Sequence, residues 1–170
     1  MKWLTRIINL GAGLLLTGAT LASSQIEPSD TEPSDDDDVI LTLIQGSERH
    51  ERSRRDIESE HQLYDVELRH FEGLDGVFTG VRLEAFLKAE GLDGARRIRF
   101  IAADEYTIFL TPEEIADKGF LLVTRFDGEP LPSDNLGPLL LVVPDEEEAV
   151  LAGEITPTHW MWSIIEMRAR

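Results

Sequence analysis

Short β-prone runs that end at glycine or proline limit how this chain can fold more than any other feature. Six such runs occur, at residues 39–44, 64–70, 96–102, 106–110, 120–126 and 139–143. The first is continuously apolar and stops at Gly46, and the last is stopped by Pro144. Several of the others alternate apolar with polar residues, which is typical of strands buried on one face. Strands outnumber helices and no long βαβ periodicity occurs, so we expect an α+β fold with a mixed β-sheet.

The helices of this fold are expected to be short. Residues 82–90 carry apolar side chains at i, i+3 and i+4, and Gly91 follows as a suitable C-terminal cap. The sequence Thr-Pro-Glu-Glu at 111–114 predicts a second helix start, with a capping box and proline in the first turn. The charged stretch 47–61 has poor periodicity, so we expect a loop or a short exposed helix there.

The amino terminus has the order of a secretory signal peptide. A short basic region is followed by the apolar run Ile7–Leu16 and then by small residues up to Ser24. An uncleaved anchor is the alternative, but the run is shorter than the ~20 residues of a spanning helix. The segment lacks a twin arginine, so we expect residues 1–24 to be removed after general (Sec-type) export. The product would then be periplasmic, with secretion as the alternative.

The mature chain begins with a strongly acidic stretch. Residues 25–38 read QIEPSDTEPSDDDD, in which like charges repel and prolines prevent regular pairing. We therefore expect a disordered acidic tether, followed by a globular domain at 39–170. Calcium binding by the aspartate run is the sharper alternative, but the glycine turn and distal glutamate of a calcium loop are missing.

Composition excludes several classes of function. The 170 residues include no cysteine, which excludes a disulfide framework, a thiolate metal site and a thiol nucleophile. The formal charge of −17 disfavours nucleic-acid binding, because phosphate affinity comes from clustered lysine and arginine. No motif of a serine hydrolase or a nucleotide-binding loop is present.

Histidine and arginine supply the candidate site residues. No two histidines have the i, i+4 spacing of a zinc helix, so we expect no metal site. Counting by twos places His70 on the apolar face of its strand, where it is either a hydrogen-bonded core residue or a site residue. Arg97 and Arg99 share a strand face, where they could line an anion pocket or pair with neighbouring strands.

The order of the motifs resembles the oxidoreductase molybdopterin-binding domain, which has the sulfite-oxidase fold. The matching pieces, in chain order, are Gly80-Val81-Arg82-Leu83, Ala103-Asp104-Glu105-Tyr106, Phe120 to Leu131 with its Asp-Gly-Glu-Pro-Leu end, Gly137-Pro138-Leu139 through Pro144, and Trp160 with Ile165-Glu166. The resemblance covers about residues 39–170. It implies the family's mixed-sheet fold, with molybdopterin as the possible cofactor, in a small single-domain exported member.

This chain departs from the family pattern where the pattern implies catalysis. Catalytic members hold molybdenum through a cysteine before the Gly-Val-x-Leu helix, about Glu67 to Glu72 here, and this chain has none. The basic residue that often follows Gly-Pro-Leu is replaced by Leu140. Imidazole does not readily replace a soft thiolate at molybdenum. The Sec-type signal also differs from the twin-arginine export expected of a folded, cofactor-loaded enzyme.

These departures favour a non-catalytic binding protein with no cofactor. The resemblance suggests that the former cofactor cleft binds a small anion, or that the domain binds a protein partner such as a membrane sensor. We expect Arg69, His70, Tyr106 and Arg97 to be the ligand-binding residues, with no catalytic residue and no metal ligand. The alternatives are a molybdopterin-dependent oxidoreductase without cysteine ligation, in which His70 is the metal ligand, and a structural envelope protein.

Overall fold

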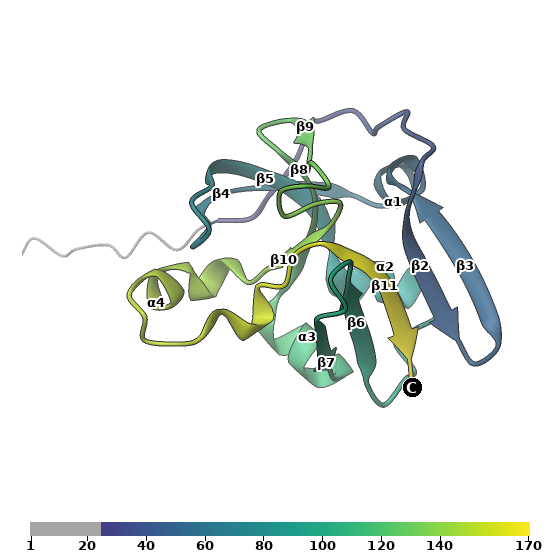
Figure 1. The fold of residues 1–170 in the computed structure, drawn as a ribbon. Coiled ribbons are helices and arrows are strands. Elements are labelled where there is room, and N and C mark those ends of the chain that lie inside the picture. The colour runs from purple at the N-terminus through teal and green to yellow at the C-terminus, as the bar shows by residue number, and fades with distance from the viewer. Residues whose placement is uncertain (1–24) are drawn as a thin grey trace, which may run out of the picture.

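The computed structural model describes residues 25–170, which form two β-sheets with short helices around them (Figure 1). The predicted signal peptide at 1–24 lies outside the described residues. The α+β class with mixed strand directions is confirmed. No helix within 25–170 combines the length and apolar character needed to cross a bilayer.

The first sheet has six strands and is antiparallel throughout. Its members are β1 (Glu27–Pro28), β4 (Leu63–Arg69), β5 (Asp75–Arg82), β8 (Leu121–Phe126), β9 (Glu129–Pro130) and β10 (Leu140–Val142). They pair in the order β1-β4-β5-β8-β10, with β9 added on β8. Gly80 lies where β5 bulges against β8, and a Cβ there would collide with the backbone of Leu122 and Val123. The glycine of the Gly-Val-x-Leu motif is therefore required by strand packing.

The second sheet is mixed. Its five strands are β2 (Val39–Gln45), β3 (Glu48–Ser53), β6 (Ile98–Ala102), β7 (Thr107–Leu110) and β11 (Ile164–Ala169). They lie in the order β3-β2-β11-β6-β7, and β11 pairs parallel with β2 while the other pairs are antiparallel. The carboxyl-terminal strand therefore occupies the centre of this sheet.

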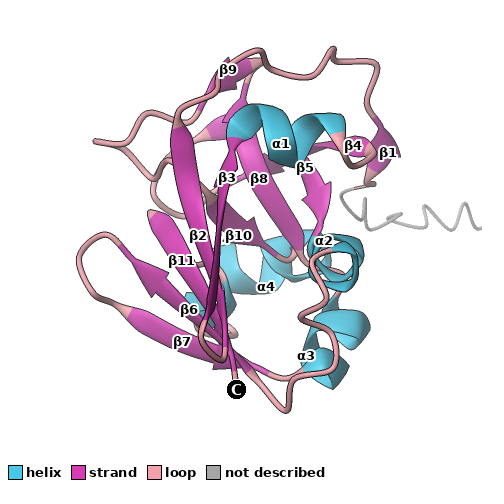
Figure 2. Ribbon diagram, turned by 90° about the vertical axis from the view of Figure 1, so that its right-hand side faces the viewer, coloured by secondary structure: helices cyan, strands magenta, loops and turns pink. Residues whose placement is uncertain are grey.

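Short helices fill the gaps around the sheets (Figure 2). They are α1 (Arg54–Ser59), α2 (Leu83–Ala89), α3 (Pro112–Lys118) and α4 (Glu147–Leu151), with 3-10 turns at η1 (Pro144–Glu146) and η2 (Pro157–His159). The predicted capping box of α3 is present, since Thr111 and Glu114 exchange hydrogen bonds, and Gly119 ends the helix at φ 65°. In Figure 2, α2 and α3 lie next to each other.

Two apolar clusters form the core. The larger cluster joins the second sheet to one face of the first and includes Phe86 and Leu87 of α2. The smaller cluster covers the other face of the first sheet, where Val150 of α4 and Trp160 contribute. Successive residues of β8 divide between the clusters, as expected for a strand buried on both faces.

The acidic segment 25–38 is packed against the domain, so the prediction of a disordered tether is wrong. Its strand β1 pairs with β4, and Figure 1 shows the segment running from that sheet edge to β2. The side chain of Asp36 pairs with Arg54, which is 4% exposed. Repulsion within the acidic run was the basis of the prediction, and basic residues of the folded domain offset that repulsion.

The charged stretch 47–61 also differs from expectation. Residues 48–53 form the edge strand β3, which was not expected. The short helix α1 was one of the expected outcomes, but three of its six residues are buried. Four of the six residues of β3 are exposed, so the strand has no apolar alternation for a sequence pattern to detect. Helix α1 begins at a capping box between Ser53 and Asp56, which the charge-rich composition concealed.

Candidate functional site

The loop after β4 is the segment where the resemblance places the family's metal-binding cysteine. His70 follows the last residue of β4 and is 2% exposed. Its N–H donates to the carbonyl of Leu74 at 2.7 Å, and its carbonyl accepts from the N–H of Gly73 at 2.8 Å. The predicted position of His70 on the apolar face agrees with this burial. A tight turn holds the residue in place.

Aromatic rings surround the His70 imidazole. The Phe71 ring stacks on it with centroids 4.5 Å apart, and the Trp160 ring lies at 5.4 Å. Phe78 and Trp162 are each 6.4 Å away. These separations are those of aromatic rings in contact. Burial in these surroundings lowers the pKa of His70 to about 4, so the ring is neutral near pH 7.

The hydrogen bonds of His70 define its tautomer. Nδ1 accepts from the N–H of Glu72 at 3.2 Å, so Nδ1 carries the lone pair and Nε2 carries the proton. Nε2 is buried and has no hydrogen-bond partner within 25–170. A neutral imidazole in this arrangement presents an N–H toward the aromatic cluster. Its lone pair is already used by the turn.

Arg69 and Tyr106 lie near this cluster in different ways. The Arg69 N–H and Nε both approach Oε1 of Glu147, at 2.9 and 3.4 Å, while 61% of the Arg69 side chain is exposed. Tyr106 lines a hollow of about 140 Å³ with Trp162, Ala102 and Asp104. Trp162 therefore contacts His70 on one side and shares this hollow with Tyr106.

Arg97 lies apart from the other three predicted residues. It precedes β6, whereas Tyr106 follows the opposite end of that strand. Five residues of strand separate these ends, which corresponds to roughly 16 Å. The guanidinium of Arg97 lies over the ring of Phe109, 4.5 Å from its centroid. The fold thus brings His70 near Tyr106 through Trp162 and leaves Arg97 outside the group.

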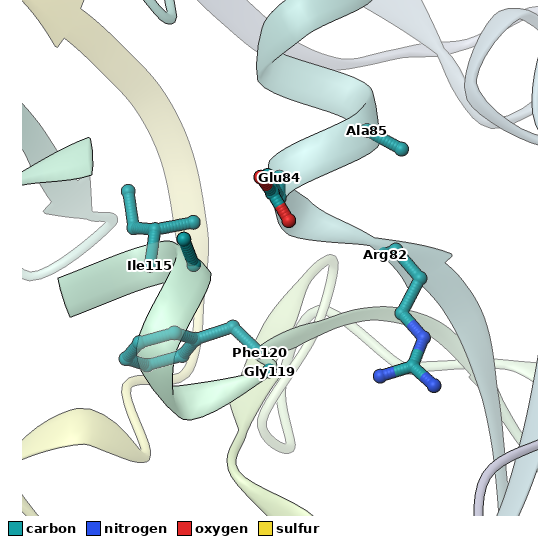
Figure 3. A pocket seen from close by; sticks show the side chains of 7 residues that line it. Arg82, Glu84, Ala85, Ile115, Gly119 and Phe120 are labelled. Carbon is teal, nitrogen blue, oxygen red and sulfur yellow. The ribbon is translucent and has the colours of Figure 1, made fainter. Parts of the chain in front are cut away.

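A second hollow, of about 300 Å³, lies between α2 and α3 (Figure 3). The guanidinium of Arg82 enters it from the end of β5, and the residues lining it include Glu84 of α2 and Phe120. Arg82 stands 5.1 Å over the ring of Tyr64 and has no hydrogen bond or ion pair with a carboxylate among residues 25–170. Of the twelve arginines within 25–170, seven pair with a carboxylate and five, Arg82 among them, do not.

Sequence reasoning did not select Arg82 as a binding residue. The sequence identifies Arg82 only as a member of the Gly-Val-x-Leu motif. An arginine between a strand and a helix is common and does not by itself indicate a binding site. The place of Arg82 in a hollow between α2 and α3 depends on how the two helices pack, which no local pattern shows. Its occurrence within a recognised motif was the available signal.

These features together define the class of protein: an α+β domain with two β-sheets, a Gly-Val-x-Leu strand–helix junction and a buried histidine in the turn after β4. The family model described as "Oxidoreductase molybdopterin binding domain" matches residues 45–150, which is more than half of the chain. The chain therefore belongs to the oxidoreductase molybdopterin-binding domain family. No curated protein matches it.

The residues around His70 do not fit the cofactor that the family name implies. The chain has no cysteine, so a thiolate ligand is excluded. For Nε2 of His70 to bind a metal, its proton would have to move to Nδ1, which would break the hydrogen bond from Glu72. Phe71 and Trp160 would also have to leave the imidazole, because their rings pack against it.

Proposed function

We propose that this chain is a non-catalytic member of its family that binds a small anionic ligand. One observation carries the proposal: His70, in the segment where the metal-binding thiolate is expected, is enclosed by aromatic rings and uses its lone pair in a backbone turn. A side chain packed in this way stabilises the core. The cysteine thiolate that holds molybdenum in catalytic members is absent from this chain.

The hollow beside Arg82 is the anion site we infer. A guanidinium without a carboxylate partner can form two parallel hydrogen bonds to a carboxylate or phosphate. Ile115 and Phe120 offer apolar surface in the same hollow, while Glu84 adds one negative charge. The ligand that fits is a small molecule with one anionic group for Arg82 and an apolar or donor-bearing remainder toward Glu84.

We propose a location outside the cytoplasm, because the amino terminus has the order of residues typical of a secretory signal peptide. A periplasmic binding domain of this size could report ligand occupancy to a membrane sensor. The packed acidic segment faces solvent with several of its carboxylates, which suits contact with a basic partner surface.

Ligand-dependent melting tests the anion site directly. The purified exported protein would be melted with phosphate, sulfate, acetate and succinate as probes, in parallel with the variants Arg82→Gln and Arg96→Gln. Arg96 is exposed and lies outside the hollow, so it is the control for loss of an arginine charge elsewhere on the chain. We expect at least one probe to raise the Tm of the wild type and of Arg96→Gln, with no rise for Arg82→Gln. An equal rise in all three proteins, or in none, would refute the site.

A further inference from the structure

Two helix ends meet on the side of the molecule where α1 and α2 terminate. Glu60 and His61 directly follow α1, and Glu90 directly follows α2. One ring nitrogen of His61 and one carboxylate oxygen from each glutamate lie within 4.8 Å of one another. We propose that Glu60, His61 and Glu90 bind a divalent transition-metal ion of the zinc class.

The donor set suits such an ion. Zinc is bound in proteins by imidazole nitrogen and carboxylate oxygen at about 2.0–2.2 Å, usually with four ligands. Ligand atoms around a tetrahedral ion are then roughly 3.3 Å apart, so small side-chain rotations from the present spacing complete the geometry. Three protein ligands leave the fourth position to water.

His61 is held in place for this role. Its ring meets the fully buried ring of Phe86 edge-on, with centroids 5.4 Å apart and an interplanar angle of 62°. Nε2 of His61 is buried and has no hydrogen-bond partner in the described part of the chain. A buried ring nitrogen without a partner is costly, and coordination to a metal ion would satisfy it.

The local charge also favours a cation. The two glutamates outweigh the nearby cation, Arg52, whose Nε and Nη2 each lie 2.7 Å from an oxygen of Glu90. A carboxylate has about four lone-pair positions, so Arg52 occupies two and leaves two for a metal. Arg52 therefore competes with the ion electrostatically while leaving room for it.

The sequence predicts no metal site because no two histidines have the i, i+4 spacing of a zinc helix. Glu90 is far from His61 in sequence and reaches it because α1 and α2 both pack on the core through Ile57 and Phe86. The site is at the opposite end of α2 from Arg82. The proposed metal site and the proposed anion site can therefore be tested, and refuted, separately.

Zinc titration of the exported protein, produced without a histidine tag, tests this inference. Binding would be measured by calorimetry, by the rise in Tm, and by the visible spectrum of Co²⁺ as a probe of coordination. His61→Ala should weaken zinc binding by about tenfold or more, since even outer-shell partners contribute that much. His50→Ala is the matched control, because His50 also lies beside a glutamate, Glu48, at 3.7 Å. It should bind zinc like the wild type.

Two further variants keep the test decisive. Glu60 is exposed, so Glu60→Gln should fold normally and still weaken binding. Arg52→Gln removes the competing charge and should tighten binding. Unchanged affinity in Glu60→Gln and His61→Ala, or equal losses in His50→Ala, would overturn the proposal, as would weaker binding in Arg52→Gln.

Discussion

The imidazole of His70 lies in surroundings that favour its neutral form. Phe71 and Trp160 exclude water from the ring, and no carboxylate or backbone carbonyl accepts from Nε2 within the described residues. Protonation would therefore place an uncompensated charge in an apolar cluster. This is the physical cause of the lowered pKa, and it makes His70 a source of pH-dependent stability.

We predict that the protein loses stability between about pH 6.5 and pH 4 because of His70. The unfolded imidazole binds a proton near pH 6.5, whereas the folded one does so only near pH 4, so acid favours the unfolded state in this window. The loss should reach about 2–3 kcal/mol, measured by urea unfolding at pH 7 and pH 4.5.

His70→Phe provides the comparison for this prediction. The variant keeps an aromatic ring in the cluster and lacks the titrating group, so its free energy of unfolding should fall less over the same pH range. Burial also lowers the pKa of His61, but His61 is present in both proteins. Its contribution to the pH dependence therefore cancels in the difference. An equal fall in both proteins would show that His70 does not titrate as described.

At the scale of elements, a buried ion pair fastens the acidic segment to the domain. The Glu58 side chain is fully buried, and Arg125 donates to it through Nε at 3.0 Å and also through Nη2. The N–H of Ser34 donates to the same carboxylate at 2.7 Å, and Arg125 reaches the carbonyl of Glu32 at 3.0 Å. Burial alone would raise the pKa of Glu58, but these hydrogen bonds outweigh it and hold the pKa below its ordinary value.

Removing the Arg125 guanidinium should destabilise the fold strongly. Arg125→Gln leaves the Glu58 carboxylate buried without its partner, a change that costs about 3–5 kcal/mol in comparable cases. Arg168→Gln is the control, because its pair with Glu166 is partly exposed, so water and salt screen it and its loss should be small. Urea unfolding measures both. Similar losses in the two variants would contradict the role of the Glu58–Arg125 pair.

Local patterns in the sequence were enough to predict some elements and not others. Helix α3 was predictable because its capping box and terminal glycine are contained within nine residues. Strand β3 was not, because an edge strand exposed on both faces has no alternation. The acidic segment was misjudged because its partners, Arg54 and Arg125, are distant in sequence.

Some features of the candidate site were also predictable from local sequence, and others depend on the fold. The burial of His70 was predictable from the sequence, because alternate residues along β4 point to the same face. The rings of Trp160 and Trp162 come from the carboxyl-terminal region and reach His70 only through the fold. Arg82 and the Glu60–His61–Glu90 group likewise depend on how helices pack, so their significance appears only in three dimensions.

At the scale of the whole molecule, the fold of the molybdopterin-binding family is combined with aromatic packing around His70, in the segment where the resemblance places the family's cysteine. Both sheets and the Gly-Val-x-Leu junction are intact, since they depend on strand packing and on Gly80. The chain has no cysteine to hold molybdenum, and the Phe71 ring stacks on His70 in the corresponding segment. A scaffold in this state is suited to recognition.

Metal analysis of the native protein tests this account most directly. The protein would be purified from the envelope of cells that make the molybdenum cofactor, and molybdenum would be measured per chain by mass spectrometry, together with pterin fluorescence after oxidation. We predict neither molybdenum nor pterin above background. One molybdenum atom and one pterin per chain would contradict the central claim.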